Sequence, residues 1–118
     1  MTDSSKNIID RQVVENLREL NPDDPNFLRE LIDLFLEDFP ARVDEIERAL
    51  ATKDAVLLTR AAHTIKGSSG NFGAASLSRV AMEMEQQGKS SSFDAAAASL
   101  VSLRAEFALV AAALRELT

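Results

Sequence analysis

The longest regular pattern in the chain is an apolar stripe that recurs every three or four residues across residues 25–52. This spacing places the apolar side chains on one face of a helix, which can then pack against a core. Pro40 interrupts the stripe without changing its phase, so we expect one bent helix rather than two. Asp24 followed by Pro25 is typical of a helix start, with an N-cap before a first-turn proline. The stripe consists of Leu28, Ile32, Phe35, Phe39, Val43, Ile46 and Leu50.

Four further segments show helical periodicity and predict helices over residues 10–20, 54–71, 74–88 and 93–117. In order, their apolar positions are Val13, Val14, Leu17 and Leu20; Leu58, Ala61, Ala62, Ile65 and Phe72; Leu77, Val80, Ala81 and Met84; and Phe93, Ala97, Leu100, Leu103, Phe107, Val110, Leu114 and Leu117.

Capping and turn residues separate these segments. Asp10 and Asp54 are placed to cap the helices that follow them. Gly73 predicts a chain reversal, and Gly88 with the serines after it predicts the end of a helix and a short linker. Short loops make neighbouring helices antiparallel. The sequence therefore predicts an all-α fold, an up-down-up-down four-helix bundle with a short accessory N-terminal helix.

Composition limits the chain to one domain and removes several functional classes. The 118 residues fit one bundle over residues 8–118, with a polar, flexible N-terminus at residues 1–7. A net charge of −6, with 13 basic and 19 acidic residues, argues against nucleic-acid binding. The absence of cysteine and the single histidine make a metal site a poor prospect. No apolar run approaches a membrane span and no secretory leader opens the chain, so we expect a cytoplasmic protein.

The single histidine, His63, falls on the polar face of the helix expected at residues 54–71. On a helical wheel the apolar positions of this helix lie on the far half, roughly 160° to 260° from His63. Ser68 and Ser69 lie on the two flanks, at the edge of the core. The positions within about 60° of His63 are Thr59, Arg60, Lys66, Gly67 and Gly70.

This exposed face is suited to phosphate chemistry. A neutral imidazole is a good nucleophile near neutral pH, and attack through a ring nitrogen would give a phosphoramidate. Lys66 supplies a positive charge one turn away, and Gly67 leaves room for a partner. A lone exposed histidine beside a lysine also occurs with no function, and the residues alone leave both interpretations open. A serine hydrolase and a carboxylate di-metal centre are disfavoured, because a strained nucleophile turn and a second histidine are missing.

The residues around His63 resemble a known family. The run His-Thr-Ile-Lys-Gly-Ser-Ser at residues 63–69, followed by Gly73, Ala74 and Leu77, is similar to the signature of histidine-containing phosphotransfer (HPt) domains. The resemblance extends over about residues 8–117, and the family fold is a four-helix bundle with an accessory N-terminal helix. HPt domains are intermediate carriers in phosphorelays.

The resemblance implies roles for individual residues. His63 would be phosphorylated, Lys66 would help to hold the phosphoryl group, and Gly67 would admit the partner. Ser68 and Ser69 match the small hydroxyl pair behind the histidine. Glu85 and Lys89 match helix-end positions that orient the histidine or add positive charge in some members.

The resemblance also implies the partners. They would be receiver domains of response regulators, or a hybrid sensor kinase, and Mg²⁺ would sit on the receiver. The chain itself would need no cofactor, would have no ATP-dependent kinase activity, would be monomeric, and would bind neither nucleic acid nor a membrane. Part of the helix at residues 25–52, near Phe27, Leu31 and Leu34, would form the docking surface.

Two other functions remain open at this stage. One is the phosphotransfer domain of a chemotaxis-type kinase, phosphorylated from ATP by a separate kinase domain. The other is a module that docks receivers without carrying phosphate.

Overall fold

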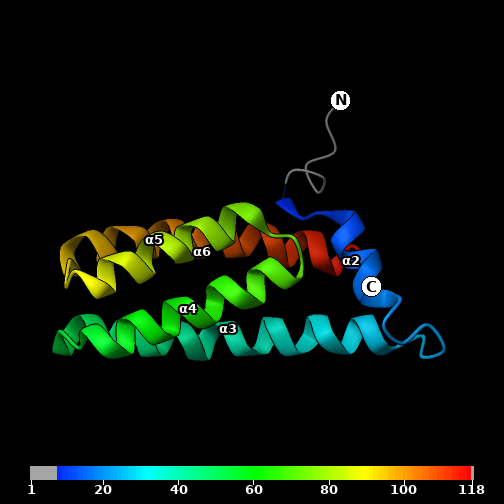
Figure 1. Cartoon of the computed structure of the whole chain (residues 1–118), viewed down its shortest axis with the longest axis horizontal. Coiled ribbons are helices and arrows are strands. Elements are labelled where there is room, and N and C mark those ends of the chain that lie inside the picture. Colours follow the sequence, from blue (N-terminus) through cyan, green and yellow to red (C-terminus); the bar gives the residue numbers. More distant parts are fainter. Residues whose placement is uncertain (1–7, 118) are drawn as a thin grey trace.

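The computed structural model describes residues 8–117. The expectation of a flexible segment at residues 1–7 lies outside these residues. The described helices are α2 (Arg11–Arg18), α3 (Phe27–Thr52), α4 (Ala55–Asn71), α5 (Ala75–Lys89) and α6 (Phe93–Arg115). The all-α prediction is confirmed, and α3 to α6 are the four long helices of a bundle (Figure 1).

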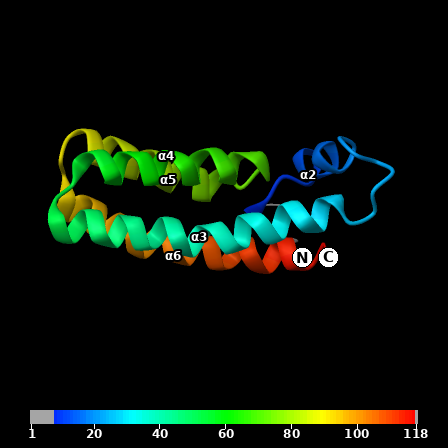
Figure 2. The same cartoon turned by 90° about the horizontal axis from the view of Figure 1, so that it is seen from below.

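The four long helices pack in a ring that follows their order in the chain. α3 contacts α4, α4 contacts α5, α5 contacts α6, and α6 closes the ring on α3. Figure 2 shows α4 and α5 on one side of the bundle, α3 and α6 on the other, and α2 at one end. α4 therefore lies between α3 and α5 and diagonally opposite α6.

The start of α3 differs from the prediction. The helix begins at Phe27 with Asn26 as its N-cap, two residues later than expected. The Asp24 carboxylate accepts a hydrogen bond from the Asn26 amide at 2.9 Å, so Asp24 closes a turn containing Pro25 instead of capping the helix. Pro40 lies inside α3 without ending it, as predicted, and it is exposed to solvent.

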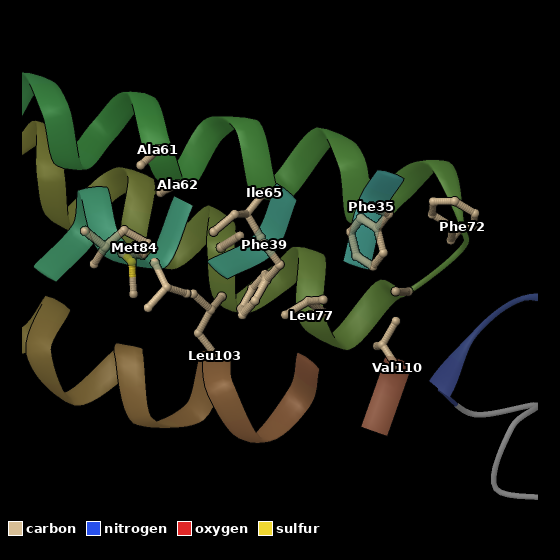
Figure 3. Packing of buried hydrophobic residues seen from close by; sticks show 14 of the residues in the cluster. Phe35, Phe39, Ala61, Ala62, Ile65, Phe72, Leu77, Met84, Leu103 and Val110 are labelled. Carbon is tan, nitrogen blue, oxygen red and sulfur yellow. The ribbon is translucent and has the colours of Figure 1, made fainter. Parts of the chain in front are cut away.

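The predicted stripes form one core, with three exceptions, of which Val13 is half-buried outside the core cluster. Figure 3 shows side chains from α3, α4, α5 and α6 meeting between the helices. Phe39 stacks on Phe107 with ring centroids 3.7 Å apart, joining α3 to α6. Leu20 is 72% exposed, because α2 ends before it. Ala97 is exposed and Ala96 is buried in its place, because the inward face of α6 steps from Phe93 by three residues rather than four.

One described helix, α6, is long and apolar enough to cross a membrane when length and composition alone are considered, with a mean hydropathy of 1.6. This stretch does not stand out in the sequence as one apolar run, because Arg104 and Glu106 interrupt it. A core helix passes the same test, and a third of the apolar window of α6 is buried in the bundle, where Leu103 and Val110 lie in the core.

Gly73 forms the predicted reversal between α4 and α5, with a φ of 67°. A Cβ at this position would lie 2.5 Å from the Cβ of Asp10, whose amide donates a hydrogen bond to the Gly73 carbonyl. The turn is therefore tied to the start of α2, and only glycine fits both the conformation and the contact.

Replacing Gly73 with alanine is expected to lower the free energy of unfolding by about 2 kcal/mol, because positive φ and the overlap with Asp10 both oppose a side chain. Gly70 is the matched control: it lies within α4 and faces open space, so Gly70→Ala should be neutral or stabilise by up to about 1 kcal/mol. Urea denaturation of the two variants tests this difference, and equal effects would contradict it.

Candidate functional site

His63 is presented by a helix whose opposite face is fully buried. The Asp54 carboxylate accepts a hydrogen bond from the Leu57 amide at 3.0 Å and caps α4. Leu58, Ala62 and Ile65 are each at most 2% exposed. His63 points away from them, and its side chain is 65% exposed. The wheel prediction is confirmed for His63 and for the apolar half of the helix, whereas Thr59, expected on the exposed face, packs against Gly88 of α5. The well-packed helix fixes the backbone beneath the imidazole.

The structure adds a buried carboxylate beneath the histidine. Glu85 of α5 is only 5% exposed. One of its oxygens, Oε2, lies 2.7 Å from His63 Nδ1, and the other, Oε1, accepts a hydrogen bond from Lys66 Nζ at 2.7 Å. Glu85 thus joins the histidine and the lysine into one cluster.

Glu85 is ionised in this cluster. The hydrogen bond from Lys66 holds the pKa of the Glu85 carboxyl below its usual range; burial opposes this, and the hydrogen bond from His63 adds to it. An ionised carboxylate can only accept hydrogen bonds, so Nδ1 of His63 must be the donor. The proton of a neutral imidazole then sits on Nδ1, and the lone pair is on Nε2. The geometry therefore selects Nε2 as the nucleophilic atom.

A glycine brings Glu85 close enough to reach the histidine. Gly88, predicted to end its helix, is a buried residue inside α5, which runs to Lys89. A Cβ at Gly88 would lie 2.9 Å from the Thr59 amide nitrogen. Since no side chain separates the two helices here, the last turns of α5 lie against the first turns of α4.

The other residues of the predicted site divide into two groups. Thr59 faces this helix contact, and its hydroxyl donates a hydrogen bond to the Ala55 carbonyl at 2.7 Å, so it is a packing residue. Arg60 and Lys89 are exposed and line one groove together with His63. The structure therefore brings two cations beside the imidazole in addition to Lys66.

The small residues after His63 also separate into exposed and buried positions. Gly67 and Gly70 are exposed, and a Cβ at either would meet nothing within 4 Å. Ser68 is half-buried and donates its hydroxyl hydrogen bond to the Thr64 carbonyl at 3.0 Å. Ser69 is fully buried, so its expected place at the edge of the core was wrong. It lies inside because α4 continues to Asn71 and the α4–α5 turn folds over it.

A second groove lies on the α3 side of α4. Leu31, Leu34 and Phe72 line it, together with Ser68 near the site. Leu34 is 63% exposed, which leaves a large apolar side chain in solvent. Two of the three residues expected in the docking region are thus in this groove, while Phe27 is not among the residues that line it.

The family model of the Hpt domain matches residues 30–116, which is most of the chain. The chain belongs to the Hpt domain family. Hpt domains transfer phosphoryl groups through a histidine in phosphorelays, and His63 is the single histidine of this one.

Individual relatives agree with the family. Histidine-containing phosphotransfer protein B of Pseudomonas aeruginosa is 29% identical, with a TM-score of 0.84 over 92% of each chain. A histidine-containing phosphotransfer protein from maize is 23% identical, with a TM-score of 0.83 over 95% of this chain and 83% of its own; it supports the fold. Multistep phosphorelay regulator 1 of Schizosaccharomyces pombe is 28% identical over 90 residues, which cover 75% of this Hpt domain but only 30% of that protein.

No group of three or more potential metal ligands occurs among residues 8–117.

The roles of two site residues could not be fully assigned from the sequence. Glu85 follows the core residue Met84, and this position on the edge of the apolar stripe was the only local signal that it is buried. Val56 is exposed and lines the groove of Arg60 and Lys89, and it carried no signal because an exposed valine near a helix start has no special pattern.

Glu85→Gln should make the stability of the Hpt domain less dependent on pH. Because the folded-state pKa of Glu85 is lowered, its contribution is present above its usual pKa of about 4.5 and is lost as the pH falls through the lower folded value. Wild type should therefore lose stability below about pH 4.5 more steeply than the variant. Urea denaturation between pH 3 and pH 7, roughly the range in which carboxylates titrate, measures this. Parallel curves would show that Glu85 is not ionised in the cluster.

Proposed function

We propose that this Hpt domain is a phosphorelay intermediate that accepts a phosphoryl group on His63 and passes it to a receiver domain. The donor is a phosphorylated aspartate of another receiver, free or within a hybrid sensor kinase. The observation that carries the proposal is the hydrogen bond from His63 Nδ1 to the ionised Glu85 carboxylate, which leaves the exposed Nε2 with its lone pair.

The transfer step balances without a proton transfer. Nε2 attacks the phosphorus of the acyl phosphate, the Nε2–P bond forms, and the P–O bond to the aspartate breaks with release of its carboxylate. The ring keeps its proton on Nδ1 and becomes cationic, and the negative charge of Glu85 lies 2.7 Å from that atom. Reversal onto a second aspartate returns the ring to its neutral form.

Lys66 supports the same step from the other side of Glu85. Its ammonium group is bound to Glu85 Oε1 and is one helical turn from His63, within reach of new phosphoryl oxygens. A lysine has three donors, so an ammonium held by Glu85 keeps donors for phosphate.

The proposed partners are receiver domains, which complement the nucleophile of this site. The receiver supplies the aspartate and the Mg²⁺, while this chain supplies an oriented nucleophile and needs no cofactor. The apolar groove that includes Leu31 and Leu34 is the docking surface on the α3 side of His63. We propose a monomeric, cytoplasmic carrier without ATP-dependent kinase activity.

The deciding experiment offers two phosphate donors. Wild-type protein is mixed with a panel of ³²P-labelled receivers, and separately with ATP and an isolated chemotaxis-type kinase domain. Rapid labelling from a receiver supports the proposal. Labelling from the kinase alone would assign the domain to the kinase-linked class, and receiver binding without labelling would make it a docking module.

A further inference from the structure

The groove that Arg60 and Lys89 line adjoins His63 on the side of α4 away from α3. It runs between the first turns of α4 and the last turn of α5. Thr59 and Gly88 form its base, where the two helices touch. Its borders are Arg60 on α4 and Lys89 on α5, with His63 and Val56 at either end along α4.

Two cations and one carboxylate line this groove, and the carboxylate, Glu85, is already bound by Lys66 and His63. The whole chain carries a net charge of −6. Several of its basic side chains, such as Arg42 and Arg104, form ion pairs with carboxylates. Arg60 and Lys89 have no side-chain hydrogen bond or ion pair with any residue of the described range 8–117. Two cations from different helices thus converge on one groove beside the phosphoacceptor, where an external anion can pair with both.

The length and the apolar part of the groove indicate what that anion belongs to. Val56 is 68% exposed. It lies seven residues before His63, or about 10 Å along the helix at 1.5 Å per residue. A phosphoryl group on His63 spans only a fraction of that distance, whereas a protein loop with an aliphatic side chain next to a carboxylate can contact Val56 and both cations together.

We infer that this groove is a second docking surface, which binds an acidic loop of the receiver domain through Arg60 and Lys89 and an aliphatic side chain of that loop through Val56. The inference rests on the proposed function. It assigns the two cations mainly to the rate at which the partner associates, because charges at the border of an interface steer encounter. The groove on the α3 side would supply apolar contact on the other flank of His63.

The test measures binding rather than phosphate transfer. The probe is the unphosphorylated form of the receiver that labels wild-type protein fastest, and stopped-flow fluorescence gives its association rate. Arg60→Gln/Lys89→Gln should lower this rate about five- to tenfold at low salt. The difference should largely disappear at about 0.5 M salt, where charges are screened. Val56→Ser should raise the dissociation rate about threefold.

The matched control is Arg48→Gln/Arg79→Gln, which removes the same charge from two exposed arginines that do not line the groove. Equal effects in the two double variants would overturn the inference, because only the net charge would then matter. Unchanged binding with a shorter phosphohistidine lifetime would also overturn it, and would assign Arg60 and Lys89 to the phosphoryl group. If no receiver labels the wild-type protein, the proposed function fails first, before any variant is compared.

Discussion

Replacing His63 with alanine is expected to abolish phosphoryl acceptance while the bundle stays folded. The chain has no other histidine, and the imidazole Nε2 is the atom that the hydrogen bond to Glu85 leaves exposed and unprotonated. The side chain contributes little to packing because it is 65% exposed. Glu85 keeps its ion pair with Lys66 in the variant, so the free energy of unfolding should fall by no more than about 1 kcal/mol. Incubation with a labelled receiver, followed by gel analysis, measures the loss of acceptance.

The chemistry of the label provides the control on the wild-type protein. A phosphoramidate on His63 should be lost in acid and retained in base, and ³¹P–¹⁵N coupling should place the phosphorus on Nε2. Phosphate attached to Nδ1 would contradict the hydrogen-bond assignment at Glu85. Equal labelling of His63→Ala would contradict the proposed function itself.

Replacing Gly67 with glutamine is expected to separate stability from transfer. Gly67 is inside α4, on the exposed face one turn after His63, and a Cβ there would meet nothing within 4 Å. Glutamine favours helix more than glycine does, so the variant should gain about 0.5–1 kcal/mol of stability. The longer side chain would occupy the approach to Nε2, and a displacement of about 1 Å at the reacting atoms can lower a rate about 100-fold. Transfer from the receiver should therefore fall by about that factor or more.

Gly67→Ala separates bulk from helix propensity. A methyl group also stabilises the helix, but it should leave transfer within a few-fold of wild type because the space around it is open. Thermal melts and single-turnover transfer on the same protein preparations give both quantities. A Gly67→Gln variant that transfers at the wild-type rate would show that the partner does not approach over this face.

The Hpt fold was readable from sequence to the extent that it depends on local spacing. The stripe in α3 and the caps at Asp10 and Asp54 predicted the corresponding helices, because amphipathic periodicity and capping act within a few residues. The predicted start of α3 was wrong because an aspartate such as Asp24 can either cap a helix or close a turn. The local sequence does not show which of the two it does. The predicted burial of Leu20 and Ala97 was wrong for a related reason. Their exposure depends on where α2 ends and on how α6 is rotated about its axis.

The sequence by itself determined that His63 would be exposed on a helix whose opposite face is buried. Lys66 and Gly67 share the face of His63, because one helical turn brings these residues together. Only the tertiary structure decided which ring nitrogen is free. That depends on Glu85, which is 22 residues away on another helix and reaches His63 because Gly88 lets α5 lie against Thr59. It also decided that Arg60 and Lys89 share a groove. Contacts between helices depend on their rotation and separation, which the packing of the whole core sets and which no short stretch of sequence contains.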